Sequence, residues 1–379
     1  MIAQGGTLLL SESRLRHNVR LFRQRLAPRV KLGAVVKANA YGHGLNEVAP
    51  LLPAAGIEWL CVYSLAEALA AAAITAGMPI LAMAPVILHD SSAPWSPWPP
   101  AWLQDERIRI TLTDESSARR LAAQLAERRF PRPLPVHVQV DTGLTRHGVA
   151  AEHAPRLLDC IARLPPLRLE GVFMQLSHGE EPDHPACRRQ LEIFLELTDR
   201  FKTRRPELIR HAQNSGGSWH WPEAPLDLVR LGIGLYGLQP SWRHPLRDLQ
   251  PVASLVAPIA ALHARPRGVG VGYGHLFITA RPSRLAVVPV GYADGYPRAL
   301  SNRAEALVRG HRVPVVGRVS MDQLVLDVTD VAVEIGDVVT LVDNDPASPL
   351  CLDRLAGLCD TIGYELATGF GPRLVRRMV

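Results

Sequence analysis

Short apolar runs alternate with segments of helical period between about residues 30 and 235 of this chain. Each run is five to seven residues long and is typical of a strand that is buried on both faces. Eight such strands are predicted, at residues 31–37, 59–63, 79–84, 107–112, 135–141, 168–174, 208–213 and 226–231. Between most of them, the apolar pattern predicts helices, at residues 64–76, 115–128, 154–162 and 187–202.

Eight strand-and-helix units within about 210 residues indicate a (β/α)8 barrel of the TIM type. A doubly wound open sheet is the competing arrangement, because it is built from the same alternation of strands and helices. We favour the barrel and assign residues 1–240 to it.

The pattern changes after residue 240. From residue 251 onward, short Val-rich runs are separated by Gly and Pro turns, and helical period returns only near residues 352–359. Residues 241–379 are therefore predicted to form a second, mostly β domain. A stretch rich in Trp and Pro at residues 91–102 is predicted to be an irregular surface loop.

Composition excludes several classes of protein. With 47% apolar residues and a net charge of +6 over 379 residues, the chain can bury a large core and is not a disordered protein. No apolar run approaches the roughly 18 residues that a membrane span requires. The longest candidate, residues 60–78, contains Ser64, Glu67 and Thr75. The basic residues are spread along the chain without a recognisable nucleic-acid-binding motif, so we expect neither a membrane nor a nucleic-acid partner.

The cysteines and the N-terminal residues indicate the compartment. The five cysteines are scattered, odd in number and without metal-ligand spacing, which argues against disulfides and structural zinc. The first residues carry neither a basic segment nor a long apolar run, so no signal peptide is expected. We therefore expect a cytoplasmic protein without a bound metal.

Lysine is scarce in this chain: Lys31, Lys37 and Lys202 are the only lysines among 42 basic residues. Since arginine supplies the charge elsewhere, a lysine at the end of a buried strand calls for a specific reason. Lys37 ends the first predicted strand and precedes a Gly-rich turn, and the carboxyl ends of barrel strands hold the active site in such folds. Burial there lowers the pKa of an amine and makes it a nucleophile, which an arginine cannot be.

The segment around Lys37, KANAYGHG, resembles the lysine motif of the alanine racemases, which bind pyridoxal 5′-phosphate (PLP). The resemblance continues in the family's order through VQVDTGLTRHG, RHAQNSGG, VRLGIGLYG, GVGYGHLF, VGYADGYPR, VGRVSMDQ and TIGYE. It implies a PLP-dependent amino-acid racemase with an eight-stranded barrel and a C-terminal β domain. It also implies a homodimer with shared active sites and an amino acid as the small-molecule partner.

The resemblance also implies which residues bind the cofactor. Barrel phosphate sites are usually built from the loops after strands seven and eight, and several of the matching residues lie there. The residues implied to bind PLP are Lys37, Tyr41, Asn214, Ser215, Arg230, Gly232, Ile233 and Tyr364. Arg230 matches the arginine that faces the pyridine nitrogen. Because arginine stays cationic, that nitrogen is expected to remain unprotonated, which favours racemisation over decarboxylation.

Racemisation requires an acid/base group on each face of Cα. The resemblance assigns Lys37 to one face and Tyr273 of the partner subunit to the other. It also implies that Arg146 and the Met321 backbone contact the substrate carboxylate and that Tyr292 narrows the entrance. Four further residues of these motifs are interpreted as supporting or structural: His43, Asp141, His211 and Asp322.

Three positions depart from the family pattern. Gln139 stands where many racemases carry a carbamylated lysine, so no carbamate is expected, and the amide or an anion such as chloride would support Arg146 instead. Gln175 stands where the family usually has a histidine stacked on the cofactor ring, with His178 nearby. Ser320 replaces a cysteine often found before the methionine. These changes bear on alanine specificity and speed more than on PLP binding.

We therefore expect an enzyme that interconverts L- and D-alanine and supplies D-alanine for peptidoglycan. A racemase of serine, lysine or arginine is the first alternative. A PLP-binding protein with little turnover is the second, although such a protein would have no need of a second base at Tyr273.

Overall fold

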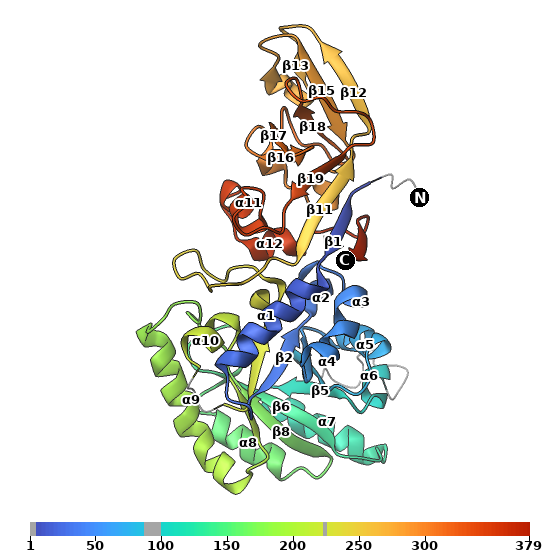
Figure 1. The fold of residues 1–379 in the computed structure, drawn as a ribbon. Coiled ribbons are helices and arrows are strands. Elements are labelled where there is room, and N and C mark those ends of the chain that lie inside the picture. Colours follow the sequence, from blue (N-terminus) through green and yellow to red (C-terminus); the bar gives the residue numbers. More distant parts are fainter. Residues whose placement is uncertain (1–4, 87–99, 223–225) are drawn as a thin grey trace.

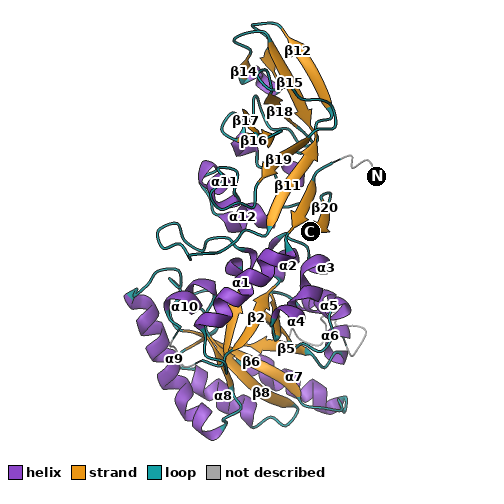
Figure 2. Ribbon diagram, in the orientation of Figure 1, coloured by secondary structure: helices purple, strands orange, loops and turns teal. Residues whose placement is uncertain are grey.

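A computed structural model describes residues 5–86, 100–222 and 226–379 (Figure 1). The chain forms a barrel of strands surrounded by helices and an elongated region that extends from it. Figure 2 shows that strands and loops dominate the elongated region, whereas most helices lie around the barrel. The prediction of a barrel followed by a mostly β region is confirmed.

Eight parallel strands form the barrel in the order β10-β2-β3-β4-β5-β6-β8-β9. They are β2 (Lys31–Val35), β3 (Trp59–Val62), β4 (Ile80–Pro85), β5 (Ile108–Leu112), β6 (Leu134–Asp141), β8 (Leu167–Phe173), β9 (Ile209–His211) and β10 (Leu228–Leu231). A short strand, β7 (Val149–Ala150), pairs with β6. β10, the last barrel strand, pairs with β2, the first, and within the described residues no ladder joins β10 to β9 at the other end of the order. Two backbone hydrogen bonds, from Asp227 N to Arg210 O and from Arg230 N to Gln213 O, still connect β9 and β10, so the sheet is a nearly closed barrel and not an open doubly wound sheet.

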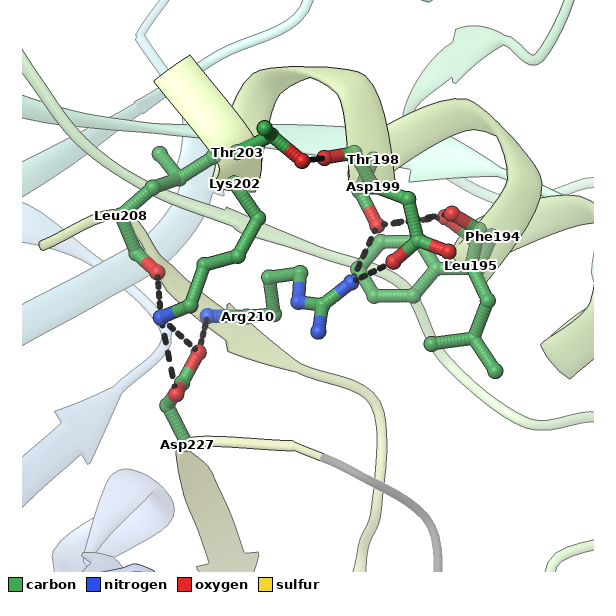
Figure 3. A network of polar contacts seen from close by, with 9 residues as sticks. All are labelled: Phe194, Leu195, Thr198, Asp199, Lys202, Thr203, Leu208, Arg210 and Asp227. Carbon is green, nitrogen blue, oxygen red and sulfur yellow. Dashed lines mark hydrogen bonds and ion pairs between the residues drawn. The ribbon is translucent and has the colours of Figure 1, made fainter. Parts of the chain in front are cut away.

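A polar cluster reinforces the junction between β9 and β10 (Figure 3). The backbone N–H of Asp227 donates to Arg210 O (2.9 Å), and the Asp227 carboxylate accepts from Arg210 N (2.8 Å). Lys202 Nζ donates to both carboxylate oxygens of Asp227 (3.0 Å each) and to Leu208 O (2.8 Å). One of the three lysines therefore has a structural role, in which a compact ammonium with three donors joins a helix end to two strands.

Helices cover the outside of the barrel. The longer ones are α1 (Glu12–Arg25), α5 (Leu65–Ile74), α7 (Glu115–Glu127), α8 (Ala154–Ala162), α9 (Pro185–Arg204) and α10 (Ser215–His220). The shorter ones are α2 (Lys37–Tyr41), α3 (Leu45–Val48), η1 (Ala49–Leu51), α4 (Leu52–Ala55), α6 (Ala101–Gln104) and η2 (Ile233–Tyr236). Of the loop predicted at residues 91–102, residues 91–99 lie outside the described residues. The prediction is wrong at its end, where α6 buries Trp102 against the core.

Both ends of the chain meet in the β region. β1 (Thr7–Leu10) pairs with β11 (Ala253–Pro258) and with β20 (Val375–Met378) in a six-stranded sheet. The first strand therefore lies outside the barrel, although the sequence division groups it with residues 1–240. The other strands of the β region are β12 (Ala261–Arg265), β13 (Gly270–Val271), β14 (Phe277–Ile278), β15 (Ser283–Val288), β16 (Glu305–Val308), β17 (His311–Pro314), β18 (Leu324–Asp327) and β19 (Val338–Val342). Its helices are η3 (Tyr273–His275), η4 (Tyr292–Asp294), η5 (Arg298–Leu300), α11 (Leu352–Leu358) and α12 (Gly363–Thr368).

Three findings concern the compartment and metal content. Within the described ranges, no helix combines the length and the apolar character needed to span a bilayer. All five cysteines are unpaired thiols. The same ranges contain no cluster of three or more His, Cys, Asp or Glu side chains suited to a metal ion.

Candidate active site

A cavity of about 670 Å³ opens at the carboxyl ends of the barrel strands. All eight residues predicted to bind the cofactor line it: Lys37, Tyr41, Asn214, Ser215, Arg230, Gly232, Ile233 and Tyr364. Arg146 lines it too, as do the two glutamines at the departing positions, Gln139 and Gln175. Residues from the far ends of the sequence therefore meet in one place.

Lys37 stands at the start of a left-handed turn. β2 ends at Val35, two residues before the predicted end, and residues 38–41 all have φ between +50° and +55°. Left-handed backbone costs roughly 1–2 kcal/mol for each residue other than glycine, so side chains must hold this turn. Glu67 accepts from the backbone N–H that follows Lys37 (2.8 Å), and Asn39 Oδ1 accepts from the first N–H of α3 (2.8 Å).

The surroundings of Lys37 favour its neutral amine. Burial lowers the pKa of Lys37, and the positive charges of Arg146 and Arg230 lower it further, against the opposing effect of Glu67. Among the described residues, its ammonium has no hydrogen-bond acceptor or ion-pair partner. A half-buried amine with a lowered pKa and no partner can act as a nucleophile or as a base.

The loops after β9 and β10 form a narrow cradle. Ser215 Oγ accepts hydrogen bonds from Gly232 N (3.0 Å) and Gly234 N (3.2 Å), which joins α10 to η2. A Cβ atom at Gly232 would lie 2.9 Å from Tyr41 Oη, so the tyrosine hydroxyl closes over the glycine. Burial raises the pKa of Tyr41 to about 12 and that of Tyr364 further still, so both hydroxyls remain protonated donors. Hydroxyls and backbone N–H groups without bulk suit a phosphate group.

Arg230 is buried against one side of the cavity. Its guanidinium donates to four neutral acceptors: His211 Nδ1 (2.7 Å), Met174 O (2.8 Å), Gln175 Oε1 (3.0 Å) and Ala212 O (3.0 Å). Burial lowers the pKa of Arg230 to about 10, which leaves it cationic at neutral pH. His211, interpreted from the sequence as structural, holds this arginine, and Gln175 turns its amide toward the arginine as well.

The loop after β6 carries the residue predicted to meet the substrate carboxylate. Asp141 Oδ1 accepts from three successive backbone N–H groups of residues 143–145 (2.9–3.1 Å), which gives it the structural role expected. Arg146 follows directly, and among the described residues its guanidinium has no acceptor. Gln139 is buried in the wall of the same cavity. An unpaired guanidinium over the cavity is suited to a carboxylate.

Three predicted residues do not reach this cavity. Tyr273, Tyr292 and Met321 lie on the surface of the β region and are 74%, 43% and 52% exposed. Tyr273 follows β13, at the end of the β region far from the barrel (Figure 1). Tyr292 and Met321 are neighbours, since Tyr292 N donates to Ser320 O (3.0 Å) and the next N–H donates to Met321 O (3.0 Å). Asp322 pairs with Arg373 at 2.7 Å.

Several cavity residues were not predicted from the sequence. They are Val35, Tyr63, Met83, His147, Phe173, Ile362, Glu365 and Thr368. Four of them fall in the last residues of predicted strands, and that position was a usable signal. Ile362, Glu365 and Thr368 lie in or next to α12 in the β region, so strand position gave no signal for them, although Ile362 and Glu365 belong to the TIGYE motif.

Comparison with known proteins decides the family. Residues 10–240 match the alanine racemase N-terminal domain, and residues 252–378 match the alanine racemase C-terminal domain. The chain belongs to the alanine racemase family. The alanine racemase of Synechocystis sp. is 35% identical over the whole of both chains. That of Syntrophobacter fumaroxidans is 38% identical over 94% of this chain and 93% of its own.

Solved alanine racemases share the fold. The enzyme from Streptomyces lavendulae aligns with a TM-score of 0.86 and 32% identity over 99% of this chain and 97% of its own. The enzyme from Bartonella henselae, solved with covalently bound pyridoxal phosphate, aligns with a TM-score of 0.83 and 29% identity over 99% of both chains. The residues of this family member fit that group: the cavity offers one unpartnered amine, a glycine cradle that a Cβ would fill and a buried cation.

Proposed function

We propose that this protein interconverts L- and D-alanine with bound PLP by moving protons on both faces of Cα. Lys37 carries the proposal, because a lysine in a chain nearly free of lysine lines the cavity as a half-buried amine with a lowered pKa. Arg230 and Arg146 share the cavity with it. Family membership supports the same reaction.

The cavity residues divide between holding the cofactor and holding the substrate. When bound, PLP binds the substrate's amino group covalently and delocalises the negative charge that develops at Cα. Lys37 Nζ would anchor it, and the cradle formed by Tyr41, Ser215 and Gly232 would hold its phosphate. Asn214, Ile233 and Tyr364 would complete that cradle. Arg146 would bind the substrate carboxylate, since its guanidinium has no other acceptor among the described residues.

Arg230 directs the chemistry toward racemisation. A fully buried guanidinium with four neutral acceptors can donate a hydrogen bond but cannot take up a proton. Arg230 would therefore leave the ring nitrogen of bound PLP unprotonated, which would limit how far negative charge spreads away from Cα. Return of a proton to Cα is then the favoured outcome.

The two proton-transfer groups are Lys37 and Tyr273 of the partner subunit. Lys37 Nζ removes a proton from, or returns one to, one face of Cα. Tyr273 cannot serve the cavity of its own chain in this arrangement, since it is exposed at the far end of the β region. In a homodimer, the second copy would bring Tyr273, Tyr292 and Met321 over the cavity. The exposure of these three apolar and aromatic side chains supports such an interface.

The site departs from the family pattern at Gln139, which cannot carry a carbamate. Its amide, which lines the same cavity as Arg146, or an anion would orient that arginine instead. We propose that the product, D-alanine, serves peptidoglycan synthesis and that the protein works in the cytoplasm, where its five unpaired cysteines fit a reducing environment.

Conversion of L-alanine by the purified, PLP-loaded protein tests the proposal. L-serine, L-lysine and L-arginine are assayed in parallel, and the Lys37→Ala variant serves as the blank. Turnover of alanine well above the other three supports the proposal. Preferred turnover of another amino acid would make it a racemase of that substrate, and bound cofactor without turnover would make it a PLP-binding protein.

A further inference from the structure

A row of buried polar side chains continues from Arg230 across the barrel interior. His211 Nε2 lies 2.9 Å from His137 Nδ1, and His137 Nε2 lies 3.4 Å from Glu170 Oε2. At the far end, Glu170 accepts from Arg109 Nε (2.8 Å). Both histidines are fully buried, and the row joins β10, β9, β6, β8 and β5 in turn. It therefore connects the cavity wall to the opposite half of the barrel.

The two ends of this row fix the position of every proton in it. Arg230 has donors only, so His211 Nδ1 must accept and its proton must lie on Nε2. That proton is donated to His137 Nδ1, so the His137 proton must lie on Nε2 and point at Glu170. The ionised carboxylate of Glu170 has acceptors only. Each histidine is thus neutral and has a single permitted tautomer.

The charges around the row support this arrangement. Burial alone would raise the pKa of Glu170, but the hydrogen bonds from His137 and Arg109 lower it to about 2. Burial lowers the pKa of His137, although Glu170 opposes that effect, and burial together with the charge of Arg230 lowers the pKa of His211 well below its ordinary value. An ionised acceptor at one end and a cation at the other therefore polarise two neutral imidazoles in one direction.

We propose that Glu170 is a positioning residue of the racemase. Through His137 it keeps the proton of His211 on Nε2, so that His211 Nδ1 accepts from Arg230 and holds the guanidinium in place beside the cofactor's ring nitrogen. The proposal rests on the proposed function for the placement of that ring nitrogen. Without a fixed acceptor at Glu170, the row can reverse, and an N–H of His211 would then face the N–H groups of Arg230 at 2.7 Å. The guanidinium would have to move.

The first test measures the tautomers directly. Holoenzyme labelled with ¹⁵N-histidine is studied by NMR at neutral pH, with the His137 and His211 signals assigned from single His→Gln variants. We expect both imidazoles to be neutral, with the proton on Nε2. A protonated Nδ1 on His211 in the wild-type enzyme would overturn the proposal. This result depends on neither turnover nor the folding of a Glu170 variant. A failure of this proposal can therefore be distinguished from a failure of the proposed function.

The second test removes the charge at Glu170. In Glu170→Gln the amide can donate as well as accept, so we expect His211 to show a mixture of tautomers. We also expect the kcat for alanine to fall about ten-fold while its KM changes less than about two-fold, since a displaced active-site group affects the reacting geometry most. The matched control is Arg168→Ala, which removes an exposed partner of Glu170 (3.0 Å) but leaves the row intact. Unchanged tautomers and unchanged kcat in Glu170→Gln would overturn the proposal, as would an equal loss in the control.

Discussion

Replacing Asp227 with alanine should loosen the barrel between β9 and β10, the two strands that no ladder joins in the described part of the chain. The carboxylate accepts from Arg210 N (2.8 Å) and twice from Lys202 Nζ (3.0 Å each). Loss of the acceptor for the backbone N–H costs about 1–3 kcal/mol. The ion pair adds about 0.5–1 kcal/mol, because 27% of the Lys202 side chain and 33% of the Asp227 side chain are exposed to solvent. We expect a total loss of roughly 1.5–4 kcal/mol.

The same change should weaken cofactor binding, because β9 and β10 lead directly into the two loops of the cradle. Ser215 follows β9, Gly232 follows β10, and one hydrogen bond of 3.0 Å joins them. If the strands separate, the donors that surround the phosphate separate as well. We therefore expect the dissociation constant for PLP to rise several-fold.

Thermal melting of the apoprotein and PLP titration are the assays for Asp227→Ala. A loss of this size lowers the melting temperature by roughly 3–16 °C in a domain of about 240 residues. Arg281→Ala is the control, since it breaks an exposed ion pair with Asp330 on the β region and should leave both quantities unchanged. A melting temperature within about 1 °C of the wild type would refute the conclusion that the contacts of Asp227 with Lys202 and Arg210 stabilise the junction between β9 and β10.

Three further predictions concern the site. Burial lowers the pKa of His43 from 6.5 to about 4, so its contribution to stability is complete above about pH 6.5 and is lost as the pH falls toward 4. In His43→Gln, denaturation curves should therefore show a smaller loss of stability between about pH 6.5 and 4. An unchanged loss of stability over that range would contradict the role of burial. Gly232→Ala places a Cβ against the Tyr41 hydroxyl. It should weaken PLP binding at least ten-fold and leave the melting temperature of the apoprotein unchanged. A PLP affinity equal to that of the wild type would show that the phosphate binds elsewhere. Gln175→His should provide a ring that stacks on the cofactor, worth about 0.5–1.5 kcal/mol, and tighten PLP binding about 2- to 10-fold. Weaker PLP binding would show that the lost hydrogen bond from Arg230 to the Gln175 amide outweighs the stacking.

The barrel could be predicted from the sequence because its strands are buried on both faces. Their apolar runs are continuous and bounded by polar residues, so each observed strand begins and ends close to the prediction. The largest differences are of two residues: β2 ends at Val35, β9 ends at His211 and β10 begins at Leu228. Of residues 38–41 only Asn39 tolerates left-handed backbone, and the alanines and the tyrosine disfavour it, so the sequence does not predict this turn. Glu67, about thirty residues away, supplies the contact that holds it.

The residues that line the cavity were partly predictable from the sequence, but the hydrogen bonds that hold Arg230 from inside the barrel were not. The resemblance placed Arg230 and His211 in the chain, but it could not show that one donates to the other. His137 and Glu170 read as ordinary strand residues, and their contact depends on the register between β6 and β8. The place of Tyr273 relative to a cavity depends on a second copy of the chain, which no pattern within one sequence specifies.

The central claim is that one active site takes Lys37 from one subunit and Tyr273 from the other. Lys37→Ala and Tyr273→Phe, each inactive alone, are co-expressed with different tags, and alanine racemisation by the mixed population is measured. Half of the dimers are then mixed, and each mixed dimer holds one site with both bases intact, so we predict about a quarter of the wild-type activity. No activity in a population shown by its tags to contain mixed dimers would contradict the claim, because it would place both groups on the same chain.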